Sequence, residues 1–384
     1  MRKFLQELLD FFKKGDMVLL ALCLLTTAFG CVEIASATAW TGSIKSVIIQ
    51  IVAAGLGVGL YAVVSSIDLD LILEFRVPMF LFNTFLLLLL IPFGVDYDSG
   101  NKSWIDIPFL PIDLQPAEIC KITFVLIMAS VMGSHQNHIS RVPSIAHMVF
   151  HLGFLFLLNI ALSGDYGVSL IFVFIFIGMT FSGGVHGFYF ALAGGLTAIG
   201  IPILWNYVMK GYHRLRFEVL WNPDLDPLAI NERYHTNQSL LSLTGGGLTG
   251  QGLFNGARTK VHALNAQHTD YIFSAIGEEM GFLGCLAVLV LEFAIIARIM
   301  YVGMRTPDYV RKLVCYGAAS ALIFQVLINV GMCIGLTPVI GLTLPFVSYG
   351  GSSIVSLYGM LGLVSGAYAR PTPGKQGLYV QPPR

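Results

Sequence analysis

Long apolar runs alternate with short polar segments along the whole chain. A helix needs about 20 apolar residues to cross the bilayer core, and roughly ten runs approach that length. They are residues 17–38, 45–66, 72–94, 116–134, 144–162, 166–183, 186–209, 271–303, 312–336 and 345–369. Because the bilayer core offers no water to backbone groups, these runs must be helices. The pattern predicts an all-α, polytopic membrane protein with about ten transmembrane helices.

The composition agrees with several membrane spans. Of the 384 residues, 55% are hydrophobic and 11% are charged, whereas an average soluble domain carries about 25% charged residues. The mean hydropathy is +0.76. These values exclude a soluble enzyme with one membrane anchor. The net charge of zero gives no information about nucleic acid, and no nucleic-acid partner is expected.

Basic residues in the polar segments predict the orientation of the chain. Cytoplasmic loops are enriched in Lys and Arg, and three basic groups fall on one side of a ten-helix arrangement. The groups are Arg2, Lys3, Lys13 and Lys14; Arg305, Arg311 and Lys312; and Arg370, Lys375 and Arg384. We therefore expect both termini in the cytoplasm. Residues 1–384 are expected to form a single membrane domain with a large extracytoplasmic loop at about 210–268, since long segments translocate largely regardless of charge.

The stretch LNAQHTDYIFSAIGEEM, residues 264–280, places acidic residues where this loop enters a long apolar run. Asp270 precedes the run, and Glu278 and Glu279 lie at its beginning. Either Thr269 or Asp270 could cap the helix, and acidic residues suit the positive end of the helix dipole. On the residues alone, capping is favoured over a catalytic role.

Glu118 and Lys121 lie at the start of the run 116–134, three residues apart. This spacing places them on one face of a helix. They form either an ion pair near the membrane interface, with the lysine reaching toward water, or part of a polar pathway inside the membrane.

Two single residues have ordinary structural explanations. Trp104 lies in a polar loop and suits the aromatic belt at the membrane interface. Asp165, in SGDYGVS, suits a tight turn between two spans.

Two segments are rich in residues that break helices. TPVIGLTLPFVSYGGSS, residues 337–353, ends with the hydroxyl groups of Ser352 and Ser353, and it is either a re-entrant cavity wall or a flexible loop. TGGGLTGQGLFNG, residues 244–256, lacks both the ending of a Walker loop and the spacing of a dinucleotide motif. No nucleotide cofactor is therefore expected.

Taken together, the motifs resemble the SEDS family (shape, elongation, division and sporulation), which includes RodA and FtsW. The resemblance covers almost the whole chain. It rests on SWIDI, QPAEICKI, GDYG, NQSLLSLTGGGLTGQGLFNG, HTDYIFSAIGEEMGFLG and LPFVSYGGSS, which occur in this order. LFNGARTK is closer to RodA-type than to FtsW-type sequences, which favours an elongation-type protein.

The resemblance implies a peptidoglycan glycosyltransferase that polymerises lipid II, the undecaprenyl-pyrophosphate-linked disaccharide-peptide, at the outer face of the cytoplasmic membrane. It also implies a class B penicillin-binding protein as partner. By position, Asp270 matches the family's essential aspartate, proposed as the catalytic base. Glu118 and Lys121 match a conserved pair, and Trp104 matches a loop tryptophan. The chain departs from the family at residues 264–268, where a Pro-Glu often precedes His-Thr-Asp.

The implied reaction joins a sugar hydroxyl to an anomeric carbon and expels a lipid pyrophosphate. A carboxylate is the natural base for the hydroxyl proton, and a single displacement with inversion needs only one. The departing charge calls for cations or a divalent metal, Mg²⁺ or Mn²⁺. The candidate substrate-binding residues are Glu118, Lys121, Trp104, Arg214, Arg216, Arg258, Lys260, His268, Ser352 and Ser353.

Two other functions compete with this interpretation. Broken helices and a charged pair inside the membrane would also suit a transporter or a flippase for lipid-linked precursors. The second competing function is that of a non-catalytic scaffold that recruits a penicillin-binding protein. Against a flippase, the polar groups cluster toward the expected outer face.

Overall fold

The computed structural model describes residues 14–96, 101–108, 112–208, 211–222, 225–226 and 233–370. Within these residues, nine helices are long and apolar enough to cross a membrane, and α9 is a shorter apolar helix. The apolar helices are α2 (Met17–Ala37), α3 (Lys45–Ser66), α5 (Arg76–Leu88) followed by α6 (Leu90–Phe93), α7 (Pro116–Ser134), α8 (Val142–Ser163), α9 (Tyr166–Ser182), α10 (Gly187–Ile203), α14 (Ile272–Arg305), α15 (Tyr309–Cys333) and α16 (Gly351–Ala369). The prediction of an all-α protein with about ten transmembrane helices is confirmed.

Smaller elements connect these helices. They are η1 (Ala39–Thr41), α4 (Leu69–Leu73), β1 (Gly94–Val95), β2 (Trp104–Ile105), η2 (Gln136–His138), η3 (Leu204–Val208), α11 (Gly211–Trp221), α12 (Tyr234–Gly246) and α13 (Ala257–Lys260). The strands β1 and β2 form an antiparallel pair. The loop expected at about 210–268 therefore contains helices α11, α12 and α13 in its described part.

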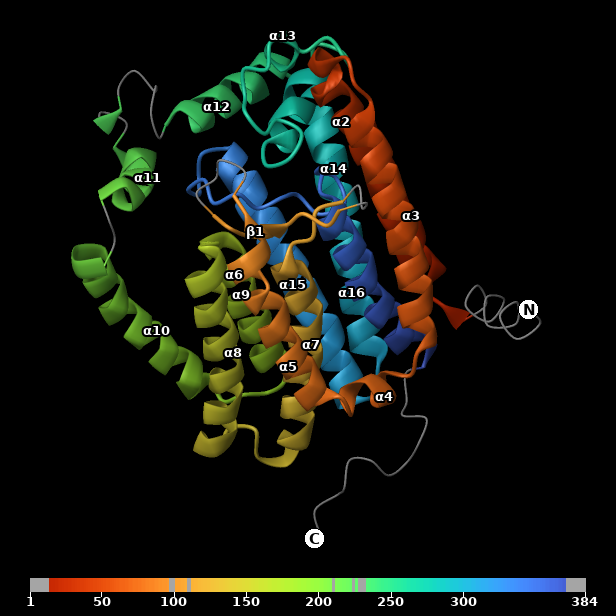
Figure 1. The fold of residues 1–384 in the computed structure, drawn as a ribbon, viewed down its shortest axis with the longest axis vertical. Helices are drawn as coiled ribbons and strands as arrows, with labels where there is room; N and C mark the ends of the chain where they lie inside the picture. Colours follow the sequence, from red (N-terminus) through yellow and green to blue (C-terminus); the bar gives the residue numbers. More distant parts are fainter. Residues whose placement is uncertain are drawn as a thin grey trace.

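Helices α7, α15 and α16 form the centre of the bundle, and the other helices surround them (Figure 1). Helix α16 packs along α3, and α15 packs against α14 and α9. Helix α10 lies apart from the bundle in Figure 1, and it contains no buried residue. Helices α12 and α13 lie across one end of the bundle, over the start of α14.

The first and last helices meet at the opposite end. The backbone N–H of Asp16 donates to Ser365 Oγ (3.0 Å), and the Asp16 side chain caps α2 by accepting from Leu19 N (3.0 Å). Arg298 of α14 forms an ion pair with Asp16 (2.9 Å). The start of α2 and the end of α16 thus lie on one side of the protein. The assignment of that side to the cytoplasm remains a prediction.

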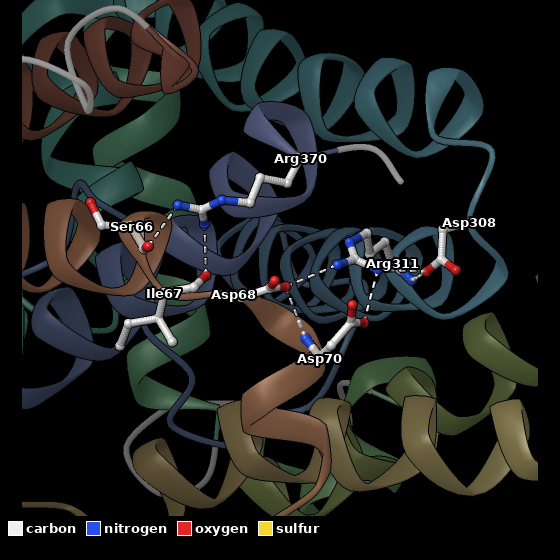
Figure 2. Close-up of polar contacts among 7 residues, drawn as sticks. All are labelled: Ser66, Ile67, Asp68, Asp70, Asp308, Arg311 and Arg370. Carbon is white, nitrogen blue, oxygen red and sulfur yellow. Dashed lines mark hydrogen bonds and ion pairs between the residues drawn. The ribbon is translucent and has the colours of Figure 1, made fainter. Parts of the chain in front are cut away.

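Arg311 fixes the same end through three carboxylates (Figure 2). Its partners are Asp70 (3.0 Å), Asp68 (3.1 Å) and Asp308 (3.4 Å). Nearby, Arg370 donates to the carbonyls of Ser66 (2.8 Å) and Ile67 (3.1 Å). These contacts join the α3–α4 corner to the start of α15 and the end of α16. The guanidinium group of Arg370 thereby satisfies carbonyls at the end of α3, where helical carbonyls lack partners within the helix.

The predicted span 271–303 is a broken helix. Gly281 has φ +66° and ψ −163°, which interrupts α14. The glycine-rich segment 247–252 fills the break: Gly252 N donates to the Glu279 carbonyl (2.9 Å), and Phe282 N donates to the Gly247 carbonyl (2.9 Å). A Cβ atom at Gly281 or at Gly250 would overlap the facing backbone. These glycines are therefore required for close backbone packing.

The predicted start of the last span at residue 345 is wrong. Helix α16 begins at Gly351, because Phe346 has a positive φ of 59°, which is not helical. The preceding segment is nevertheless buried, since Phe346 and Val347 are at most 1% exposed. It is packed, non-helical backbone rather than a flexible loop.

Candidate functional site

Asp270 lies two residues before α14 begins. The N-cap of α14 is Tyr271, and no side-chain hydrogen bond caps the helix. Thr269 Oγ1 instead donates backward to the Ala266 carbonyl (3.2 Å). The prediction that Asp270 or Thr269 caps the helix is therefore wrong. The Asp270 carboxyl group accepts no capping hydrogen bond from α14.

The backbone of Asp270 is fixed by α15. Asn329, which is completely buried, donates from Nδ2 to the carbonyls of Asp270 (2.8 Å) and Leu342 (2.6 Å). One amide group thus joins the aspartate to the buried segment before α16. Asp270 Oδ2 lies beside Gly341 of that segment, where a Cβ atom would be 3.6 Å away. A glycine here leaves space in front of the carboxyl group.

Further hydrogen bonds hold this segment against residues 268–270. Ser348 Oγ donates to the Thr269 carbonyl (2.7 Å), and Tyr349 N donates to the His268 carbonyl (2.9 Å). Gln50 of α3 donates to the Ser348 carbonyl (3.0 Å). The backbone of residues 268–270 is therefore held by hydrogen bonds from α15 and from the segment before α16.

Asp165 is a second carboxylate of the site. It is the N-cap of α9, where Val168 N donates to Oδ1 (3.0 Å). Its other oxygen accepts from Gln115 Nε2 (3.2 Å). Burial raises the pKa of Asp165, the hydrogen bond from Val168 opposes that rise, and Glu118 reinforces it. The expected structural role is confirmed, as a helix cap, but Asp165 also interacts with the candidate residues.

Burial raises the pKa of Asp270 to about 6, and the negative charge of Asp165 contributes to the rise. The positive charge of Lys121 acts on Asp165 in the opposite sense. Asp165 therefore lies within electrostatic range of both Asp270 and Lys121. Asp165 is thus electrostatically coupled to each of the two residues expected to carry the chemistry.

Glu118 and Lys121 form the predicted ion pair, with 2.8 Å between Lys121 Nζ and Glu118 Oε1. Both side chains are buried, and Lys121 is only 1% exposed, so the lysine does not reach toward water. Ser356 of α16 donates to the second carboxylate oxygen of Glu118 (2.6 Å). Each oxygen of Glu118 therefore has a partner.

The remaining predicted residues near Asp270 make local contacts. Ser352 Oγ accepts from Gln115 N (3.3 Å), which connects α16 to the start of α7. Ser353 Oγ is buried and has no hydrogen-bond partner among the described residues. The His268 ring lies 5.5 Å from the Tyr349 ring, and burial lowers the pKa of His268. Trp104 lies in β2, on the connection that leads to α7.

Glu278 and Glu279 accept hydrogen bonds from the loop that precedes α14, and they do not contact Asp270 among the described hydrogen bonds. Glu278 accepts from the backbone N–H groups of Arg258 (2.7 Å) and Thr259 (3.2 Å) and from Thr259 Oγ1 (2.9 Å). Glu279 accepts from Ser36 Oγ and from Phe254 N. These carboxylates therefore bind α13 and its approach to the start of α14.

The described side chains include three of the predicted loop cations, Arg214, Arg258 and Lys260. Lys260 is exposed and donates to Asn255 (3.0 Å). Arg258 and Arg214 are partly buried, and each has at least one guanidinium nitrogen without a hydrogen-bond partner among the described residues. The side chain of Arg216 lies outside the described part of the structure. Among the ion pairs of the described side chains, none joins these cations to Asp270.

The described residues contain no group of three or more His, Cys, Asp or Glu side chains able to hold a metal ion. Asp165 and Asp270 are electrostatically coupled carboxylates, and Mg²⁺ is often bound by one or two carboxylates plus substrate phosphates. This coupling links the residues that precede α9 and α14, and it was not predicted.

Sequence patterns did not identify Gln115, Asn329 and Ser356, which connect the site. Each forms a hydrogen bond to a residue far away in the chain. Gln115 precedes the Pro-Ala-Glu of a recognised motif, and Asn329 is a polar residue inside an apolar run. A polar residue beside a motif or inside an apolar run was the only feature of the sequence that could have identified them as site residues.

Comparisons with known proteins agree with the fold and show the family of the chain. The model of the FtsW, RodA and SpoVE family, described as cell cycle protein, matches residues 16–370. The peptidoglycan glycosyltransferase MrdB of Escherichia coli K12 is 32% identical over 69% of this chain and 70% of its own length. A probable peptidoglycan glycosyltransferase FtsW of Trichlorobacter lovleyi is 30% identical over 94% of this chain and 96% of its own length.

Solved structures are also similar. A chain of a peptidoglycan synthase complex, studied for the coordination of polymerization and crosslinking, superposes with a TM-score of 0.78 at 26% identity, covering 92% of this chain and 97% of that one. The rod shape determining protein RodA of Thermus thermophilus superposes with a TM-score of 0.68 at 26% identity, covering 92% and 96%.

Proposed function

Because the chain belongs to the FtsW, RodA and SpoVE family of cell cycle proteins, we propose that it is a peptidoglycan glycosyltransferase that polymerises lipid II. The names of the relatives MrdB and FtsW support the reaction class. The observation that carries the proposal is Asp270, a partly buried carboxyl group that caps no helix and is held by Asn329.

Asp270 acts as the general base. It takes the proton from the sugar hydroxyl of one substrate while that oxygen attacks the anomeric carbon of the other. The bond to the lipid pyrophosphate breaks in the same displacement, and the configuration inverts. A pKa of about 6 keeps the carboxylate ionised at neutral pH. It also makes Asp270 a stronger base than an ordinary aspartate, since the best catalytic pKa lies near the operating pH.

Lys121 supplies positive charge toward the departing pyrophosphate. Glu118 and Ser356 fix the position of Lys121 through a chain of two hydrogen bonds. A Mg²⁺ or Mn²⁺ ion would find a ligand in Asp165 and would neutralise phosphate charge when bound. We expect Asp270 and Lys121 to face one shared cavity.

The surroundings of the reaction belong to the proposal as well. The protein is a multi-pass membrane protein, and we place it in the cytoplasmic membrane with the site on the extracytoplasmic side. The similar chain in a peptidoglycan synthase complex supports a class B penicillin-binding protein as partner. In that arrangement one protein polymerises glycan strands and the other crosslinks them.

The test is glycan formation by purified protein from lipid II, with partner transpeptidase activity blocked. We expect Asp270→Asn to lower the rate by about 10²- to 10⁴-fold, the usual contribution of a general base. Glu292→Gln is the matched control, because Glu292 is a buried carboxyl group of α14, the helix that follows Asp270, and it has no hydrogen-bond partner among the described residues. Lipid translocation without polymer would instead support a flippase. Polymerisation that survives Asp270→Asn would remove the proposed base.

A further inference from the structure

Glu33 is a buried carboxyl group that the proposed reaction does not use. It lies on α2, it is 0% exposed, and neither of its carboxylate oxygens has a hydrogen-bond partner among the described residues. A buried charge without a partner is costly. Ionisable residues within membrane helices therefore usually have a specific function.

Glu33 faces a cavity of about 300 Å³. The other lining residues are Leu25, Ala28, Phe29, Val32, Leu253 and Met280. This volume is at the lower end of the range for small-molecule sites, about 300–1,000 Å³. Leu25 and Val32 are 57% and 48% exposed, and the face of a membrane helix that they form meets lipid. The cavity is thus an apolar recess beside the bilayer with one acidic group in its wall.

Glu279 is a second buried carboxyl group near Glu33, although it does not line the recess. It lies within electrostatic range of Glu33, and its Oε1 is also buried without a hydrogen-bond partner among the described residues. Its Oε2 is occupied by Ser36 and Phe254. Three carboxylate oxygens therefore lack donors, and no ion pair between described side chains includes Glu33 or Glu279. This charge is complementary to a cation that donates several hydrogen bonds.

We propose that the recess is a binding site for a phospholipid with a primary ammonium headgroup, with the ammonium at Glu33 and an acyl chain along the apolar wall. A primary ammonium donates three hydrogen bonds, and the two free oxygens of Glu33 in the wall of the recess can accept two of them. A quaternary ammonium donates none, and an anionic headgroup would be repelled. Glu33 lies four residues before the end of α2 at Ala37, about 6 Å along the helix, which is close enough to the membrane surface for a headgroup to reach.

The recess is separate from the reaction centre. From the start of α14 at Ile272 to Glu279 the helix spans about 10 Å, and the contacts of Glu279 lead to α2 and the loop rather than to Asp270. The proposal therefore does not depend on the proposed function. Its outcome can be measured without any catalytic assay.

The test is lipid retention by the purified full-length protein, measured by native mass spectrometry. The probes are dioleoyl phosphatidylethanolamine, phosphatidylcholine and phosphatidylglycerol at equal concentrations. We expect the ethanolamine lipid to be retained about tenfold better than the other two, since a hydrogen bond to a charged group contributes that much. Glu33→Gln should abolish this preference, and Glu292→Gln, which changes a buried carboxyl group outside the recess, should keep it.

A second variant tests the volume of the recess. Ala28→Trp fills the cavity beside the acidic group and should lower retention of the ethanolamine lipid to the level of the other lipids. If this variant does not fold, the lipid preference of Glu33→Gln is sufficient to test the proposal. Equal retention of the three lipids by the unchanged protein would overturn the proposal, as would a preference that survives Glu33→Gln. Loss of a copurifying membrane protein in Glu33→Gln, with lipid retention unchanged, would assign the recess to a partner helix and also overturn it.

Discussion

The Asp165 carboxyl group lies within electrostatic range of the Asp270 carboxyl group, although the two residues precede different helices, α9 and α14. Asp165 is itself held by Gln115 and Val168, so its charge has a fixed position. The consequence is that the basicity of Asp270 depends on a residue that need not contact the substrate.

This relationship predicts a change in the pH profile. Asp270 must be ionised to act as a base, so the rate of polymerisation should fall as the pH drops through about 6. Removing the neighbouring negative charge lowers the pKa of Asp270, so Asp165→Asn should move this fall to lower pH. Asn caps helices as well as Asp, so α9 should remain intact. The measurement is the initial rate between about pH 5 and 8. Asp165→Glu is the control that keeps the charge, and an unchanged profile in Asp165→Asn would contradict the coupling.

Asp270→Asn should also make the protein more stable at neutral pH. The pKa of Asp270 is raised from 3.8 to about 6 in the folded protein, so folding favours the protonated form. The cost of its ionisation is absent below about pH 4, grows as the pH rises, and is complete above about pH 6. Its upper limit is about 3 kcal/mol, at 1.36 kcal/mol per pKa unit, and partial exposure to solvent reduces it.

The measurement is the thermal unfolding midpoint of the two proteins in the same detergent. The unfolding midpoint of the variant should be higher than that of the unchanged protein at pH 8. The difference between the two midpoints should be smaller at pH 5. A difference that grows toward acid pH would mean that the ionised carboxylate is stabilised in the folded protein.

Lys121→Ala should be much more harmful than Lys260→Ala. Lys121 is buried and paired with Glu118, so its removal leaves an uncompensated buried carboxylate at a cost of about 3–5 kcal/mol. Lys260 is exposed, and its loss should cost less than about 0.5 kcal/mol. Unfolding and polymerisation measured at matched expression compare the two variants. The double variant Glu118→Gln with Lys121→Met should recover stability without recovering activity. Recovery of both would mean that the pair is purely structural.

Glu278→Ala should release α13 from the bundle. The substitution removes the acceptor of three hydrogen bonds from Arg258 and Thr259, and it leaves their buried donors unsatisfied at about 1–3 kcal/mol each. Trypsin should then cleave after Arg258 or Lys260 faster than in the unchanged protein, as followed by gel electrophoresis. Glu292→Gln controls for the loss of any buried carboxylate from α14. Equal cleavage in all three proteins would show that other contacts hold the loop.

The sequence predicted the helices well because the bilayer restricts the possible structures. An apolar run of sufficient length must be helical, and the pair Glu118–Lys121 followed from spacing within one helix. The contacts between Gln115 and Asp165, and between Asn329 and Asp270, join separate helices. No local pattern encodes such contacts, so they could not be predicted from spacing.

Two errors have the same physical origin. The break in α14 at Gly281 and the late start of α16 at Gly351 both lie in stretches that are apolar enough to be read as continuous helix. Hydropathy measures burial in an apolar medium, and buried irregular backbone is as apolar as helix when other parts of the protein satisfy its hydrogen bonds. From the sequence, the acidic residues after Asp270 were explained by the helix dipole. Glu278 instead accepts a hydrogen bond from the backbone of Arg258 in the loop, a contact between distant residues that no local pattern shows.

The glycines of segment 247–252 affect how a mutational scan of this protein should be interpreted. A side chain at Gly250 would displace the Glu279 carbonyl, and one at Gly281 would displace the facing backbone of the segment. Inactive variants would therefore cluster at residues that touch no substrate. Such a cluster, in a glycine pattern reminiscent of phosphate-binding loops, would report damage to the join between loop and helix and would not identify a nucleotide pocket.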